Sequence, residues 1–166
     1  MKKYKCDRVA EIGIRVGVNF RQFIKHNPEV AVAVDCWEAG VLSRNDVGYT
    51  QPELERQYNE FMADLGSKPN VQTYREYSFD AVKHFPDNYF DCIYIDADHT
   101  YEGVLRDLKD WYPKVKKRGF LLGDDYVDRV AKSGVKFGVV EAVNEFAKTN
   151  NIKFYTYPHQ KWVIIT

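Results

Sequence analysis

The chain has 166 residues, of which 45% are hydrophobic and 15% aromatic, a composition typical of a globular protein with one buried core. Its 24 Lys and Arg balance its 24 Asp and Glu, so no net charge attracts nucleic acid or an anionic membrane surface. Three scattered cysteines show no metal-ligand spacing, and the sequence displays neither a signal peptide nor a membrane span. We therefore expect a single cytoplasmic domain over residues 1–166, without nucleic-acid or membrane partners.

The segment from Val9 to Gly17 predicts a strand, a tight turn and the start of a helix. An apolar run reaches Glu11, and Gly13 and Gly17 follow. Glycine adopts positive φ easily and lets a backbone approach a ligand, while Glu11 could bind an amine or a hydroxyl. Such units form nucleotide sites in open α/β sheets. Two glycines also occur in purely structural turns, and Arg15 stands where the dinucleotide fingerprint has its second glycine.

A short helix is expected after the glycine turn, followed by a strand over residues 30–34. The continuous apolar, β-branched run of that strand is typical of burial on both faces. The strand ends at Asp35, about 20 residues beyond the glycine turn. An acid at this place commonly binds ribose hydroxyls in nucleotide-binding sheets, although Asp also favours a solvated turn.

The rest of the chain continues the alternation of helices and strands. A loop over residues 36–51 leads to a helix that Thr50 and Glu53 cap and that runs to Gly66. Ser78 is expected to cap another short helix. The other expected elements are strands over residues 70–74, 90–95, 120–122, 152–156 and 162–165, and helices over residues 101–112 and 139–146.

This order predicts an α/β fold with a doubly wound, mostly parallel seven-stranded sheet and helices on both faces. The last two strands are joined by residues 157–161 alone, and so short a connection forces an antiparallel C-terminal hairpin.

Acidic residues stand at the ends of four predicted parallel strands, namely Glu11, Asp35, Asp96 and the pair Asp124 and Asp125. The carboxyl ends of parallel strands share one edge of the sheet, so these acids should meet around one crevice. Like charges gathered there need a ligand or a cation between them. Asp96, Asp124 and Asp125 form an oxygen set suited to Mg²⁺, although Asp is also common in turns and helix caps.

His99 follows Asp96 by three residues and is a candidate general base, because an imidazole titrates near neutral pH. A local hydrogen bond at the start of the next helix is the competing interpretation.

Three motifs carry a resemblance to a known family: residues 11–17, residues 94–104 (YIDADHTYEGV) and residues 121–126 (LLGDDY). With them, the chain resembles the class I S-adenosylmethionine-dependent methyltransferases. More narrowly, it resembles the small-molecule and sugar O-methyltransferases, which include the catechol O-methyltransferase-like and macrocin-type enzymes. The resemblance covers nearly the whole chain, and its terminal hairpin argues against an NAD-dependent Rossmann domain.

The resemblance implies a place for each part of the cofactor S-adenosylmethionine. Gly13 and Gly17 would pack against its methionine part with Glu11 nearby, Asp35 would hold the ribose hydroxyls, and Ser78 would lie near the adenine.

The resemblance also implies the residues of the reaction. Asp96, Asp124 and Asp125 would hold a divalent cation that orients a substrate hydroxyl, and His99 would be the base. Asp96 thereby counts among the catalytic, the cofactor-binding and the metal-binding residues.

We therefore expect S-adenosylmethionine-dependent methylation of a hydroxyl on a small molecule or sugar, assisted by a divalent cation. The alternatives are an NAD-dependent oxidoreductase that uses the same glycine turn and a non-catalytic nucleotide-binding module. The sequence shows none of the N-terminal helices with which many relatives cover the substrate, so a second copy of the chain is a candidate cover.

Overall fold

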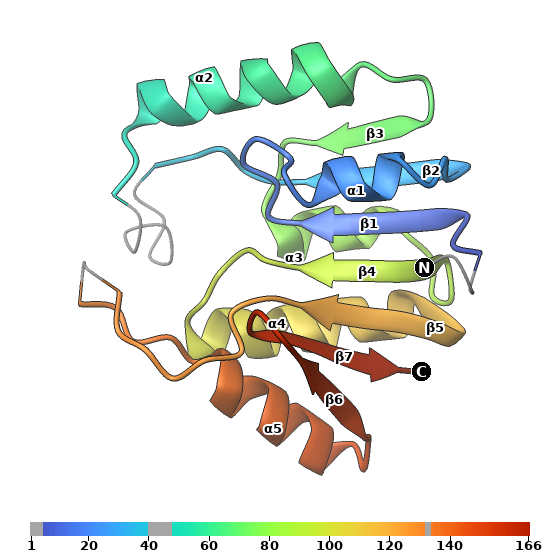
Figure 1. The fold of residues 1–166 in the computed structure, drawn as a ribbon, viewed down its shortest axis with the longest axis vertical. Helices are drawn as coiled ribbons and strands as arrows, with labels where there is room; N and C mark the ends of the chain where they lie inside the picture. The colour runs from blue at the N-terminus through green and yellow to red at the C-terminus, as the bar shows by residue number, and fades with distance from the viewer. Residues whose placement is uncertain (1–4, 40–47, 132–133) are drawn as a thin grey trace.

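The structure of the protein is a computed structural model that describes residues 5–39, 48–131 and 134–166. Seven strands form one sheet in the order β3-β2-β1-β4-β5-β7-β6 (Figure 1). The strands are β1 (Arg8–Ile12), β2 (Val30–Val34), β3 (Val71–Tyr74), β4 (Phe90–Ile95), β5 (Val115–Gly123), β6 (Phe154–Tyr157) and β7 (Lys161–Ile165).

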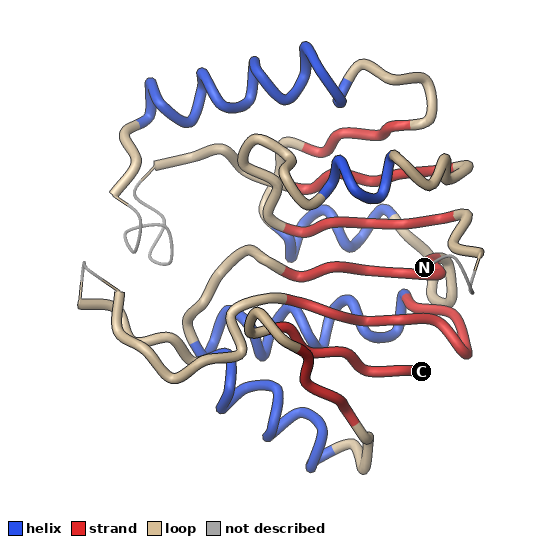
Figure 2. The backbone as a smooth tube through the Cα atoms, in the orientation of Figure 1, coloured by secondary structure: helices blue, strands red, loops and turns tan. Residues whose placement is uncertain are grey.

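Helices connect the strands and lie on both faces of the sheet, as the tube view shows (Figure 2). No helix among the described residues combines the length and the apolar character that crossing a membrane requires. The α-helices are α1 (Phe20–Ile24), α2 (Gln51–Phe61), α3 (Ser78–Ala81), α4 (Tyr101–Trp111) and α5 (Val139–Thr149), and short helical turns are η2 (Met62–Gly66, a π-helix), η3 (Val82–His84) and η4 (Tyr112–Lys114).

The first five strands run parallel, and β7 pairs antiparallel with both β5 and β6. The predicted doubly wound sheet with an antiparallel C-terminal hairpin is therefore confirmed. The strand order reverses beside β1, since β1 lies between β2 and β4. Such a reversal opens a crevice at the carboxyl ends of the strands, where ligands of open α/β sheets bind.

Alternate residues of each central strand pack into two separate cores, because successive side chains of a strand point to opposite faces. Val32 and Ile93 belong to the core under α4 and α5, whereas Val9 and Ala33 belong to the core under α1 and α2. Both faces of the central strands are therefore covered by helices, and their open edge is the one at the carboxyl ends.

The structure corrects several predicted details. The helix that begins after Thr50 has the predicted capping box, but its last turn, η2, is π-helical. The N-cap of α3 is Tyr77, and Ser78 is the first residue of that helix, so Ser78 is not the cap. Part of the predicted loop, residues 40–47, lies outside the described residues. Strand β5 begins at Val115, earlier than the apolar run 120–122 suggested, because Val115 already pairs with Phe90 of β4, and a register irregularity separates this pair from the next one, Cys92 with Phe120.

Candidate active site

The turn after β1 is held against the end of β4 by Gly13. Gly13 has a φ of +92°, and its N–H donates a hydrogen bond of 2.8 Å to the carbonyl of Val34. A Cβ atom on Gly13 would lie 2.0 Å from the carbonyl oxygen of Asp96, so only glycine fits there. The close approach of the two backbones brings the side chains that follow β1 and β4 around one crevice.

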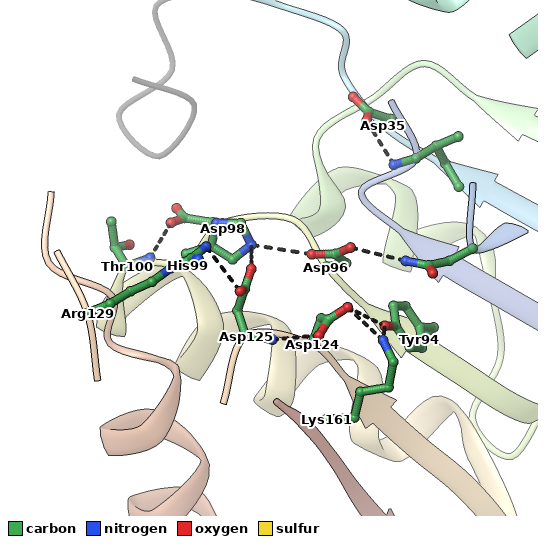
Figure 3. Close-up of polar contacts among 12 residues, drawn as sticks. Asp35, Tyr94, Asp96, Asp98, His99, Thr100, Asp124, Asp125, Arg129 and Lys161 are labelled. Carbon is green, nitrogen blue, oxygen red and sulfur yellow. Dashed lines mark hydrogen bonds and ion pairs between the residues drawn. The ribbon is translucent and has the colours of Figure 1, made fainter. Parts of the chain in front are cut away.

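Asp35, at the end of β2, is buried and fixes the same turn from the other side (Figure 3). Its Oδ2 accepts the N–H groups of Ile14 and Arg15, each at 2.9 Å, and its Oδ1 accepts the N–H of Trp37 at 2.7 Å. A carboxylate can accept about four hydrogen bonds, and backbone N–H groups already donate three to Asp35, so few acceptor sites remain for ribose hydroxyls. Its role as a ribose ligand stays a prediction, and its role in shaping the turn is what the geometry shows.

Two cavities open at the carboxyl edge of the sheet, one on each side of the Gly13 turn. The acidic cavity has a volume of about 580 Å³, and its lining includes Glu11, Asp96, His99, Asp124 and Asp125. The second, which we call the α3–α4 cavity, has a volume of about 310 Å³, and its lining includes Asp35, Ser78, Phe79, Arg106 and Asp107. Gly13 and Ala97 line both, so the cavities adjoin.

Glu11 is a buried acid in the wall of the acidic cavity. Only 1% of its surface is exposed, and its Oε2 has no hydrogen-bond partner among the described residues. Burial raises the pKa of Glu11 well above its ordinary value, and the nearby carboxylates of Asp96 and Asp35 raise it further. A positively charged ligand group would supply the missing partner and stabilise the ionised form.

Asp96, His99 and Asp125 converge on one point of the acidic cavity (Figure 3). His99 Nε2 lies 3.3 Å from Asp96 Oδ1 and 3.2 Å from Asp125 Oδ2, and one ligand atom of each residue falls within 4.8 Å of the others. The imidazole also stacks on Phe137, with ring centroids 4.7 Å apart. Burial raises the pKa of Asp96, although the hydrogen bond with His99 opposes the shift. A proton on His99 Nε2 would be shared between the two carboxylates, and the Arg129 guanidinium also contacts Asp125, at 3.1 Å.

Asp124 is not part of this convergence. Its Oδ2 accepts hydrogen bonds from Lys161 at 2.7 Å and from the Tyr94 hydroxyl at 2.8 Å, and its Oδ1 accepts the N–H of Asp125 at 3.0 Å. Burial works against ionisation of Asp124, but these donors outweigh it and lower its pKa. The predicted trio of Asp96, Asp124 and Asp125 thus differs from the group that the structure brings together, in which His99 takes the place of Asp124.

Sequence reasoning missed Lys161, which it assigned to the hairpin connection. The antiparallel register places Trp162 beside Gly123, so the first residue of β7 lies next to the end of β5. The short hairpin could have indicated this position, because an antiparallel β7 begins beside the carboxyl end of β5.

Gly17 and Ser78 lie apart from the acidic cavity. A Cβ on Gly17 would contact Phe61 and Leu65 at 2.9 to 3.1 Å, so this glycine allows α2 to pack closely and is absent from the linings of both cavities. Ser78 lines the α3–α4 cavity and donates its hydroxyl hydrogen to Asp107, another residue that sequence reasoning missed.

Comparison with known proteins identifies the family. The methyltransferase domain family matches residues 10–126. Among curated proteins, the uncharacterized protein R132 of Acanthamoeba polyphaga mimivirus is 39% identical over 64 residues, which span 36% of this chain and 28% of the viral protein.

Solved structures share the fold at low sequence identity. The SAH-bound Podospora anserina methyltransferase PaMTH1 is 15% identical with a TM-score of 0.66, over 97% of this chain and 72% of that one. The O-methyltransferase NovP is 17% identical with a TM-score of 0.64, over 99% of this chain and 73% of that one. Spermidine synthase from Thermotoga maritima is 18% identical with a TM-score of 0.58, over 96% of this chain and 52% of that one. The resemblance to class I S-adenosylmethionine-dependent methyltransferases is confirmed, and the chain belongs to the methyltransferase domain family.

Proposed function

We propose that the protein transfers a methyl group from S-adenosylmethionine to a hydroxyl of a small-molecule acceptor. The observation that carries this proposal is the bare, buried Oε2 of Glu11 beside the Gly13 turn, since an ammonium such as that of the methionine part would give it a partner. The adenosine part would occupy the α3–α4 cavity, and the acceptor would enter the acidic cavity.

The similarity to other proteins supports the same cofactor. One structural neighbour is described as SAH-bound, and another is described as an O-methyltransferase. This chain spans about 70% of the length of each, so acceptor class and partners are inferred from its own cavities.

Bound S-adenosylmethionine would supply a methyl group already activated on a sulfonium, so the protein's main task is to position donor and acceptor in line. Glu11 would hold the ammonium at the boundary of the two cavities. Asp96 and His99, which line the same cavity, would bind the acceptor hydroxyl, and His99 is the base candidate.

The convergence of Asp96, His99 and Asp125 favours a second role for this group, that of holding a divalent cation. Two carboxylates with an imidazole suit Mn²⁺, Fe²⁺ or Zn²⁺ better than an all-oxygen set would. Such a cation would polarise the acceptor hydroxyl. His99 Nε2 would then be a ligand and could not also take the proton, so activity with and without a chelator separates the two roles.

Calorimetric titration with S-adenosylhomocysteine tests the proposal. We expect saturable binding by the wild type, weaker binding by Glu11→Gln, and no competition from NAD⁺. Gln is the matched variant because it keeps the shape of Glu and removes its charge. Binding of NAD⁺ instead would support the oxidoreductase alternative, and binding of neither ligand would overturn the proposal. A cofactor complex that methylates no hydroxyl-bearing small molecule in a broad panel would favour the non-catalytic module. The oligomeric state, measured by light scattering, would show whether a second copy is present to cover the acidic cavity.

A further inference from the structure

The α3–α4 cavity contains a buried aspartate that neither the fold nor the acidic cavity accounts for. Asp107 lies on α4, is 2% exposed and lines this cavity. One of its oxygens, Oδ1, accepts the hydroxyl hydrogen of Ser78, while Oδ2 has no hydrogen-bond partner among the described residues. An acid with one bare, buried oxygen is unfavourable unless a ligand supplies the missing donor.

The neighbours of Asp107 on α4 are apolar. Val104 and Leu108 are both buried in the core, so the carboxylate of Asp107 stands in an environment that disfavours its charged form. Burial raises the pKa of Asp107 to about 7, with Asp98 and Asp110 also raising it, while Ser78 and Arg106 lower it. A donor in the cavity would favour the ionised carboxylate, and the soft terminal torsion of an aspartate lets the bare oxygen turn towards that donor.

The mouth of the same cavity offers a flat surface. The ring of Phe79 stacks on Tyr77 with centroids 5.2 Å apart and planes 8° apart, and the Arg106 guanidinium lies 5.2 Å from the Phe79 centroid. Phe79 is 36% exposed and lines the α3–α4 cavity together with Tyr77 and Arg106. Stacking of a planar base on such a surface, with a hydrogen-bond acceptor deeper inside, is a common arrangement for base recognition.

We propose that Asp107 is a specificity-determining residue that recognises the exocyclic amino group of the adenine in S-adenosylmethionine. This inference rests on the proposed function. One bare acceptor oxygen matches one amino group, whereas a hypoxanthine carbonyl at the same place would face the carboxylate as a second acceptor. The adenine would lie against Phe79 with its amino edge directed at Asp107, and Ser78 would hold the other carboxylate oxygen.

The test is calorimetric titration at pH 8 with S-adenosylhomocysteine and S-inosylhomocysteine, whose bases carry an amino group beside an unprotonated N1 in the first and a carbonyl beside an N1–H in the second. We expect the wild type to prefer the adenine ligand at least about tenfold, because a site built around a polar group rejects the analogue that lacks it. Asp107→Asn should reduce that preference, and Asp107→Leu should abolish it while the variant keeps a cooperative thermal melt. Glu102→Gln, an exposed acid-to-amide change on the same helix, is the matched control and should keep the wild-type preference.

Two results would overturn the inference and leave the proposed function standing: equal affinity of the wild type for both ligands, or an unchanged preference in both Asp107 variants. Failure of the wild type to bind either ligand would instead overturn the proposed function together with the inference.

Discussion

The ammonium of Lys161 lies 2.7 Å from Asp124 Oδ2 and 2.6 Å from the hydroxyl oxygen of Tyr94, and it thereby ties β7 to the ends of β4 and β5 (Figure 3). Lys161 therefore neutralises the negative charge of Asp124 within the protein. Asp125, the next residue, has other partners: its Oδ2 lies 3.2 Å from His99 Nε2 and its Oδ1 lies 3.1 Å from the Arg129 guanidinium. The C-terminal hairpin, which lies beyond the family match of residues 10–126, thus takes part in arranging the site.

This arrangement predicts which acids matter for a divalent cation. We expect His99→Ala and Asp125→Asn to weaken Mn²⁺ binding at least about tenfold, because each removes a ligand of the converging group. Asp124→Asn should change it by less than about threefold, since its carboxylate contacts Lys161. Calorimetric titration of the cofactor-free protein with Mn²⁺ measures all three. The opposite order, with Asp124→Asn most damaging, would restore the trio predicted from the sequence.

Removal of Lys161 should lower stability. Lys161→Met leaves the Asp124 carboxylate and the Tyr94 hydroxyl without their cationic partner. The side chains of Lys161 and Asp124 are 36% and 24% exposed, so solvent screens the pair and we expect a loss of about 1 kcal/mol in the free energy of unfolding. Urea denaturation of this variant beside Lys153→Met, a change at an exposed lysine, measures the difference. Equal stability of the two variants would show that the contact is not stabilising.

Substitution of Gly13 by alanine should destabilise the protein more than the same substitution at Gly134, a glycine at which only the positive φ disfavours a side chain. Gly13 and Gly134 have φ values of +92° and +88°, but an added Cβ would meet the Asp96 carbonyl only at Gly13, and nothing lies within 4 Å of it at Gly134. Gly134→Ala should therefore cost about 1 kcal/mol, the strain of a positive φ, whereas Gly13→Ala should cost about 3 kcal/mol or more. Chemical denaturation measures both. Similar losses would mean that the two strand ends can separate at little cost.

The sequence predicted the sheet because its strands are short, apolar and punctuated by acids and glycines. The parallel topology then placed Asp35, Asp96, Asp124 and Asp125 at one edge, as found. It could not predict which acids face one another, because that depends on side-chain direction and on long-range partners. Asp124 lies in a bend after β5 and Asp125 has a φ of +56°, so the adjacency of the two residues in the sequence does not determine which partners their side chains face.

Buried polar residues inside helices were missed for a related reason. Asp107 stands in the amphipathic pattern of α4 among charged residues, and only the packing of α3 against α4 reveals that it is buried. Likewise, the backbone contacts of Asp35 depend on the shape of the Gly13 turn, which no spacing rule specifies.

The raised pKa of Asp107 predicts a pH dependence of stability. Its pKa is about 7 in the folded protein and about 4 in an unfolded chain, so the folded state binds more protons between these values. The free energy of unfolding should therefore fall as pH rises from about 4 to about 7, by on the order of 4 kcal/mol from this residue, and level off above. The Asp107→Asn variant should not show this decrease. The difference in the free energy of unfolding between wild type and variant, measured at each pH, separates the contribution of Asp107 from that of Glu11. A difference that is constant with pH would contradict the assignment.

The central claim is that one ligand spans both cavities across the Gly13 turn. The most direct measurement is the change in backbone amide NMR shifts when S-adenosylhomocysteine is added to the isotope-labelled protein. We predict shifts at Gly13 and Ala97, which line both cavities, and at Ser78 and Phe79 in the α3–α4 cavity. Shifts confined to the acidic cavity, or no shifts at a saturating concentration of the ligand, would contradict the account.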